Sequence, residues 1–166
     1  AEKQGNHQNE LPATVMEEIM TEAISALDRG KVKMFDVAST AREEYLRVRA
    51  ELEEIKKRTK AVVEKVDQCE RKYRVLRTRL MQVSSDFSRY SEEDIHHAYI
   101  DAQDAQMELA VNRERERELK QARSEAERRL IRINNLVAQA EDMVGSLTTA
   151  LEILLRTSGS VWGVIL

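Results

Sequence analysis

The chain has 166 residues and a net charge of −3, with 27 basic and 30 acidic residues spread along its length. Because neither sign of charge dominates and no apolar run approaches the roughly 20 residues of a membrane span, we expect partners other than nucleic acid or membrane. One proline, five glycines and 34% charged residues are typical of long helices, so we expect an all-α protein. A lone cysteine cannot form an internal disulfide, which fits a reducing compartment, so we expect the protein to be cytoplasmic.

The N-terminal part is predicted to contain a variable segment followed by a short helix. We expect residues 1–13 to be disordered or variable. A helix is predicted over residues 14–29, because Thr14 and Glu17 have the spacing of a capping box and Gly30 provides a stop. The apolar side of this helix consists of Val15, Ile19, Ala23, Ile24 and Leu27.

Residues 31–88 are predicted to form a long helix with a coiled-coil seam. When heptad positions a to g are counted from an a position at Ala38, fifteen of the sixteen a and d positions up to Tyr90 are apolar or aromatic. The sixteenth is Thr59. A repeat sustained over so many turns keeps one stripe facing one partner, which is the signature of a coiled coil.

The repeat loses phase by one residue in the junction between residues 86 and 95. Ser91 and Asp94 resemble a capping box, and Glu92 and Glu93 lie in the first turn, where the helix dipole favours acidic residues. A second helix is therefore predicted over residues 92–157. Serine and aspartate before the junction are expected to end the first helix, and residues 158–166 are expected to begin a linker.

The seam of the second helix contains polar residues. Counted from an a position at Ile95, fifteen of eighteen a and d positions are apolar, and the exceptions are Asn112, Glu116 and Arg123. Such residues commonly fix register or soften a coiled coil, and we hypothesise that this segment shifts between two packings. We expect the Tyr73 hydroxyl to pair with Asn112.

Two long helices with matched seams and a short connection predict an antiparallel helical hairpin. A single continuous rod with one skipped residue is the alternative. Leu136, Met143 and Ala150 add a second apolar stripe to the second helix, which the short N-terminal helix is expected to cover in part. The apolar surface that remains predicts a homodimer that contains a four-helix bundle.

Few residues suggest site chemistry. Glu93, His97 and Asp101 recur every four residues on one helical face, which makes them a weak candidate for a divalent-metal site. Because adjacent histidines diverge, we favour exposed first-turn histidines at positions 96 and 97 and expect no metal. Cys69 is expected to pack as a small apolar group rather than as a redox thiolate. The chain contains no phosphate-binding glycine loop, nucleophile elbow or kinase nucleotide motif.

The segment from Arg79 to Leu130 resembles the N-terminal sensor region of the DegS family, the cytoplasmic histidine kinases of the DegS and DegU two-component pair in spore-forming bacteria. The most specific part is the junction, with "RL" and "VS" between residues 79 and 84, Phe87, and "SEEDI" through Tyr99. The likeness extends from about residue 36 to residue 155.

The resemblance implies a sensor domain whose helices pass a signal to a kinase core. That core, in the parent chain, uses ATP and Mg to phosphorylate itself on histidine and passes the phosphate to a DegU-like response regulator. The present fragment is then not itself an enzyme and holds no cofactor. Its expected partners are a second copy of the chain, the DegU-like regulator through the parent kinase, and an unknown protein stimulus.

The phosphoacceptor motif of such kinases, Ile-His-Asp followed by a glutamine, is only superficially similar to the sequence around His96 and His97. The acidic neighbour is missing, so neither histidine is expected to accept phosphate. The residues expected to form the dimer and signal-transmission core are Thr59, Cys69, Tyr73, Asn112, Glu116, Arg123, Leu130, Val137, Val144 and Leu151.

Two other functions stay open at the level of sequence. A generic structural coiled coil, acting as a spacer or scaffold, is supported equally well by the seams alone. An enzyme or metal-binding bundle is disfavoured, because no ionisable pair occupies facing interior positions in the Glu and Glu-x-x-His pattern of such sites.

Overall fold

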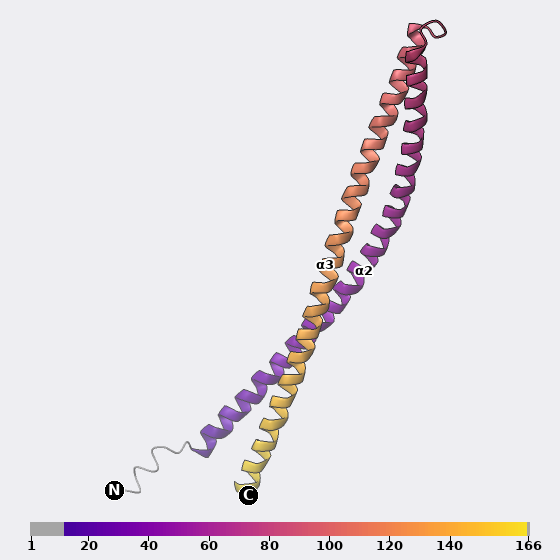
Figure 1. The fold of residues 1–166 in the computed structure, drawn as a ribbon. Helices are drawn as coiled ribbons and strands as arrows, with labels where there is room; N and C mark the ends of the chain where they lie inside the picture. The colour runs from indigo at the N-terminus through magenta and orange to yellow at the C-terminus, as the bar shows by residue number, and fades with distance from the viewer. Residues whose placement is uncertain (1–11, 166) are drawn as a thin grey trace. The chain divides into compact units, whose positions relative to one another are not determined.

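The structure is a computed structural model that describes residues 12–165, and side chains are described for residues 12–159. The described residues form two helices, α2 (Ala13–Ser85) and α3 (Glu92–Ile165), and no strand (Figure 1). The all-α prediction is therefore confirmed. The variable segment expected at residues 1–13 lies almost entirely outside the described residues. Within those residues, neither helix has a stretch long and apolar enough to cross a membrane.

The start of α2 differs from the predicted capping box. The Pro12 carbonyl accepts hydrogen bonds from the amides of Val15 and Met16 at 3.0 and 3.1 Å, so Pro12 precedes the helix and Thr14 lies inside its first turn. Proline has no amide hydrogen to leave unpaired, and its fixed φ suits a helix start. Thr14 and Glu17 therefore do not form the predicted cap.

The predicted break at Gly30 is wrong, because α2 is one continuous helix where we expected helices at residues 14–29 and 31–88. Gly30 does not have the positive φ of a helix stop. A β-carbon at Gly30 would lie 3.5 Å from Leu147 Cδ1, so Leu147 packs closely over the glycine. Glycine inside a helix costs only about 1 kcal/mol, which packing of this kind offsets.

Contacts divide the chain into two units. Unit 1 comprises Ala1–Tyr45 and Ile131–Leu166, and unit 2 comprises Leu46–Leu130. In unit 2 the chain reverses at residues 86–91, and α2 and α3 run antiparallel beside each other (Figure 1). The hairpin prediction is confirmed, and the continuous rod is excluded. α3 also continues to Ile165, through most of the segment where a linker was expected.

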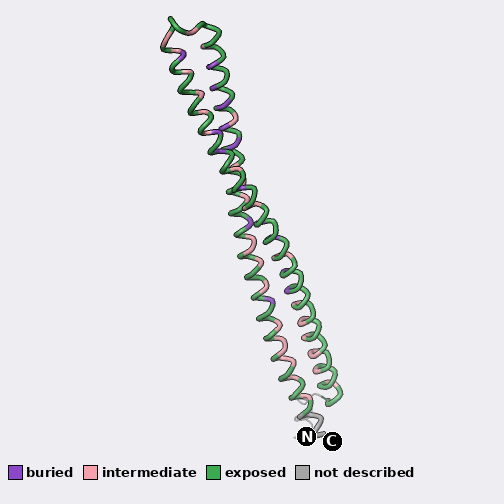
Figure 2. Tube along the Cα trace, turned by 90° about the vertical axis from the view of Figure 1, so that its right-hand side faces the viewer, coloured by how far each residue is buried: buried purple, intermediate pink, exposed green. Residues whose placement is uncertain are grey.

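The predicted seams form the core of unit 2. Figure 2 shows the buried residues on the sides of the two helices that face each other near the turn. The buried apolar residues of this unit are Val48, Leu52, Val66, Cys69 and Val83 from α2, and Ala98, Ala102, Ala105, Leu109 and Ala126 from α3. Because α3 contributes mainly alanine, the larger side chains of α2 fit against it, and large residues pack against small ones.

The turn is held by serine and aspartate, as predicted. The Ser84 hydroxyl donates to the Leu80 carbonyl at 2.6 Å, and the Ser88 hydroxyl donates to Asp86 Oδ1 at 2.8 Å. The Asp86 carbonyl also accepts the amide of Tyr90 at 3.3 Å. These local bonds replace helical ones and end α2 at Ser85.

Phe87 was predicted to lie in the seam, and this prediction is wrong. Its side chain is 79% exposed, because residue 87 belongs to the turn and no longer follows helical periodicity. On α2 the buried seam ends at Val83.

The second capping box forms as predicted, and α3 begins at Glu92. The Ser91 amide donates to Asp94 Oδ2 at 3.1 Å, and the Asp94 amide donates to Ser91 Oγ at 3.2 Å. The hydrogen bond from the Ser91 amide, followed by the interaction with the Ser91 hydroxyl, lowers the pKa of Asp94 below its ordinary value of 3.8. The charged carboxylate therefore stabilises the start of α3.

In unit 1, part of the second apolar stripe of α3 remains uncovered. Leu136 is 46% exposed and Met143 is 51% exposed, whereas Ala150 is half-buried. Because residues 13–30 continue α2 instead of forming a separate helix, they do not cover these two side chains.

The capping box predicts a specific pH dependence. A depressed folded-state pKa stabilises the protein above the unfolded-state pKa, and this contribution disappears as pH falls through the folded-state pKa. We expect Asp94→Asn to lower the melting temperature at neutral pH, and the difference from wild type to shrink below about pH 4. Melting followed by circular dichroism between neutral and acidic pH measures this difference. Asp104→Asn, an exposed carboxyl change in the interior of α3, is the control. A difference that stays constant with pH would contradict the role of the charge.

Candidate functional site

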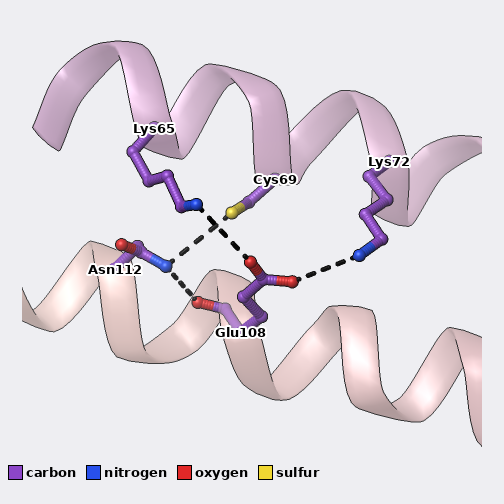
Figure 3. A network of polar contacts seen from close by, with 5 residues as sticks. All are labelled: Lys65, Cys69, Lys72, Glu108 and Asn112. Carbon is purple, nitrogen blue, oxygen red and sulfur yellow. Dashed lines mark hydrogen bonds and ion pairs between the residues drawn. The ribbon is translucent and has the colours of Figure 1, made fainter. Parts of the chain in front are cut away.

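A polar layer crosses the seam of unit 2. We define it as Lys65, Cys69 and Lys72 of α2 together with Glu108 and Asn112 of α3, all drawn in Figure 3. Two of its members, Cys69 and Asn112, are buried, and the other three lie at the edge of the helix pair. The layer brings together residues that are about 40 positions apart in the sequence, because the chain reverses between them.

Asn112 is the buried centre of the polar layer, with 8% of the residue exposed. Its Nδ2 donates to the Glu108 carbonyl at 2.8 Å and lies 3.7 Å from Cys69 Sγ (Figure 3). Sulfur is a weak acceptor, so the stronger of the two bonds stays within α3. The only hydrogen bond that Asn112 makes to α2 is therefore a weak one.

The predicted pairing of Tyr73 with Asn112 is wrong. Tyr73 and Val62 instead pack, half-buried, against an apolar cluster of Val66, Cys69 and Leu109. Asn112 donates to Cys69 and to the Glu108 carbonyl instead.

Glu108 lies between two lysines of α2. Its Oε1 is 3.9 Å from Lys65 Nζ, and its Oε2 is 3.4 Å from Lys72 Nζ (Figure 3). All three residues occupy g positions, which face each other when helix directions are opposed, and the lysines are one heptad apart. The Glu108 carboxylate therefore interacts with two lysine ammonium groups.

Other ion pairs follow the same antiparallel rule. Arg113 pairs with Glu70 at 2.9 Å across the e positions, and Arg129 pairs with Glu51 at 3.6 Å across the g positions. In unit 1, Arg42 pairs with Glu141 across e positions. Because these groups are substantially exposed, each pair contributes only a few tenths of a kcal/mol. Their consistency specifies the alignment of the helices more than it stabilises them.

The polar seam residues predicted beside Asn112 differ in their placement. Thr59 is buried, and its hydroxyl donates to the Ile55 carbonyl of its own helix at 2.7 Å. Glu116 is half-buried and pairs with Lys120 at 2.7 Å. Both therefore satisfy their polar groups within one helix.

Arg123 does not lie in the seam, and that part of the prediction is wrong. Its side chain is exposed, and Nε donates to Glu127 Oε1 at 3.1 Å on the same helix. A long guanidinium side chain can leave a seam position and reach water, whereas a short amide cannot.

The remaining core residues of the prediction are all half-buried. Leu130 belongs to unit 2, whereas Val137, Val144 and Leu151 belong to unit 1. Their role in dimerisation or signalling stays a prediction.

The weak metal candidate does not assemble. His97 Nε2 is 4.0 Å from Glu93 Oε1, and both side chains are exposed. Across the residues that the structure describes, no group of three histidine, cysteine, aspartate or glutamate side chains is placed to hold a metal ion. Glu93, His97 and Asp101 therefore share a helical face without converging.

The sequence reading missed the edge of the polar layer. Lys65, Lys72 and Glu108 were not singled out, although the antiparallel hairpin was predicted. The signal was present: once the hairpin is assumed, g positions of α2 face g positions of α3, and these three residues have complementary charge.

The polar layer predicts that Asn112→Leu stabilises the protein. Leucine would replace a buried amide that has only one weak contact to α2 and would pack beside Cys69 and Leu109. We expect the free energy of unfolding in urea to rise by about 1–2 kcal/mol. Gln103→Leu, which changes an exposed amide on the same helix, should leave stability within about 0.5 kcal/mol. A loss of stability in Asn112→Leu would mean that the polar contacts contribute more than the apolar replacement.

The family model described as sensor protein DegS matches residues 17–161. The signal transduction histidine-protein kinase/phosphatase DegS of Bacillus subtilis (strain 168) is 31% identical over 148 residues, which are 89% of this chain and 38% of that protein. The protein of the same name from Brevibacillus brevis is 29% identical over 139 residues, which are 84% of this chain and 36% of that protein.

The chain thus spans little more than a third of the length of these curated relatives. No solved structure matches it. The family match begins earlier than the resemblance inferred from the sequence and includes residues 17–35. It covers most of α2 and α3, including the polar layer and the turn. The chain belongs to the DegS sensor protein family.

Proposed function

We propose that this chain is the regulatory region of a longer, cytoplasmic histidine kinase. In this proposal it controls autophosphorylation of the parent and phosphotransfer to a DegU-like response regulator. Membership of the sensor family supports the signalling role, and the printed name of the relatives includes both kinase and phosphatase. ATP and Mg bind in the parent's kinase core, and the helical region sets the balance between the two activities.

The position of Glu108 between two lysines is the observation that carries the proposed mechanism. If α3 moves along α2 by a fraction of a heptad, Glu108 shortens its distance to one lysine as it lengthens its distance to the other. The electrostatic energy of the pair therefore changes little during such a movement. Asn112 keeps its main hydrogen bond within α3 throughout. The polar layer is thus a place where two packings of similar energy are available.

A homodimer is part of the proposal, and the exposed apolar surface of unit 1 supports it. Leu136 and Met143 lie on one exposed stripe of α3, and Val32 and Phe35 of α2 are each more than half exposed. A shallow groove in the same unit is lined mainly by apolar atoms and includes Val37, Ile133 and Leu136; its full lining is Asp36, Val37, Thr40, Ala41, Glu44, Ile133 and Leu136. A second copy of the chain would bury this surface.

A structural spacer is the competing function. The seams of α2 and α3 suit that function as well, but a spacer needs no buried amide in its middle and gains stability from its removal. The two functions differ in what Asn112→Leu does to the parent kinase, because only a regulator couples the packing of the seam to catalysis.

In the full-length parent, we expect Asn112→Leu to hold the kinase in one packing and so to shift the ratio of its kinase and phosphatase activities. A bias of 1–2 kcal/mol toward one packing changes the ratio of the two activities by about fivefold or more. The ratio is measured from autophosphorylation with labelled ATP and from phosphate transfer to, and loss from, a DegU-like regulator. The Gln103→Leu parent, with the same change at an exposed position, serves as the control. An unchanged ratio, together with a higher melting temperature, would support the spacer instead.

The dimer is tested with the present chain by sedimentation equilibrium. We expect Met143→Glu to raise the dimer dissociation constant by about tenfold, because a charge replaces an apolar side chain in the proposed interface. Met107→Glu, at an exposed methionine in unit 2, should leave the constant unchanged. A wild-type chain that stays monomeric at tens of micromolar, a concentration at which weak specific dimers form, would refute the dimer.

A further inference from the structure

Charge is unevenly distributed where unit 2 approaches the turn. Residues 71–85 of α2 contain five basic residues and no acidic residue. Residues 92–108 of α3 contain six acidic residues and neither lysine nor arginine. Only part of this charge meets across the helix pair, since the cross-helix pairs of this region are those of Lys65, Lys72 and Arg113 described above.

Two of the five basic side chains of residues 71–85, those of Arg71 and Arg74, occupy positions that face away from α3. We define the basic face as Arg71, Arg74, Val75, Thr78, Arg79 and Gln82, which line one shallow groove on α2. Apart from Arg79 at a g position, they occupy b, c and f positions, the outer side of a coiled-coil helix. All are exposed, and Val75 at the centre is 68% exposed.

Arg71 and Arg74 of the basic face lack the ion pairs found elsewhere on the helix, whereas Arg79 interacts electrostatically with Asp94 of α3. Further back on α2, Lys56 pairs with Glu53 at 3.5 Å and Arg58 with Glu54 at 3.3 Å. On the basic face, Arg71 Nε donates only to the Asp67 carbonyl, at 3.3 Å. Among the side chains that the structure describes, no carboxylate lies within ion-pair distance of Arg74.

This arrangement is unfavourable for the isolated helix. Arg71, Arg74 and Arg77 follow one another at i and i+3 spacing, where like charges destabilise a helix. An exposed valine between them adds no folding energy. A row of uncompensated arginines around an exposed apolar residue is therefore better explained by binding than by stability.

We propose that the basic face binds an acidic amphipathic helix of a partner protein. The guanidinium groups of Arg71 and Arg74 suit bidentate pairing with carboxylates, and Val75 supplies an apolar contact between them. The face is one helix wide, and its residues recur at three- and four-residue intervals, the spacing at which a docked helix presents its own side chains. The inference does not depend on the proposed control of a kinase.

The carboxylates of α3 favour a single acidic helix as the partner over a wider anionic surface. A bilayer or a nucleic-acid duplex is broader than one helix, so either would extend over α3 and meet exposed carboxylates such as Asp101 and Asp104. These carboxylates would repel lipid phosphate or a nucleic-acid backbone. A single acidic helix can lie along the basic face without reaching them.

The test uses the present chain and a fluorescein-labelled synthetic peptide built from repeated Glu-Leu-Ala-Glu-Glu-Ala-Leu units. We expect binding by fluorescence anisotropy, weakened about tenfold or more by the double variant Arg71→Glu/Arg74→Glu. Lys57→Glu/Lys60→Glu is the matched control, because it makes the same charge change at f and b positions two heptads earlier. This control should stay within about twofold of wild type. Circular dichroism checks that every variant is helical.

Further measurements distinguish an acidic helix from the other possible partners of the basic face. Val75→Ser should weaken binding of the peptide by about threefold, since an amphipathic helix uses the apolar contact with Val75. Absence of peptide binding, equal losses in the two double variants, or no effect of Val75→Ser would overturn the proposal. Tighter binding to phosphatidylglycerol vesicles or to duplex DNA than to the peptide would also overturn it. A change in the sedimentation of the chain alone in Arg71→Glu/Arg74→Glu would instead assign the face to contact between copies.

Discussion

The reversal of the chain at residues 86–91 determines which residues meet in unit 2. Because α2 and α3 run in opposite directions, the g edge of one helix meets the g edge of the other and the e edge meets the e edge, and the register sets which residues lie opposite each other. Cys69 therefore lies beside Asn112, Glu70 beside Arg113, and Lys72 beside Glu108. A parallel or continuous arrangement would separate all three pairs.

Local patterns in the sequence were sufficient for the helices, the seams and the turn. Thirteen of the fourteen seam positions between Ala38 and Val83 of α2 are apolar or aromatic and identified the interface stripe, and Ser91 with Asp94 marked the start of α3, because periodicity and capping depend on neighbours in sequence. The predictions that were wrong concern features that depend on tertiary contacts or on side-chain length. Gly30 does not end α2 because Leu147 packs over it, and Arg123 leaves the seam because its side chain reaches water.

The candidate site was predicted only in part, for a related reason. The seam pattern correctly places Asn112 between the helices. Its predicted hydrogen-bond partner was Tyr73, the larger polar group nearby, but in the structure Asn112 donates to Cys69 and to the Glu108 carbonyl. Which of several close groups accepts a hydrogen bond depends on rotamers and ångström-scale distances. Periodicity specifies a position to within a turn of helix and does not resolve such distances.

The apolar seam by itself discriminates poorly between registers, because a slide of one whole heptad returns every a and d position to the interface. The alanines of α3 weaken this discrimination further, since small side chains fit against many partners. Asn112 supplies what the seam lacks: a slide in one direction would set its amide against Val62, and a slide in the other against Leu76. Either move takes the Asn112 amide from Cys69 to an apolar side chain, which removes the weak cross-helix hydrogen bond while the bond to the Glu108 carbonyl persists. The polar layer therefore opposes whole-heptad slides, while Glu108 between its two lysines permits smaller movements, and this combination confines any shift to a narrow range.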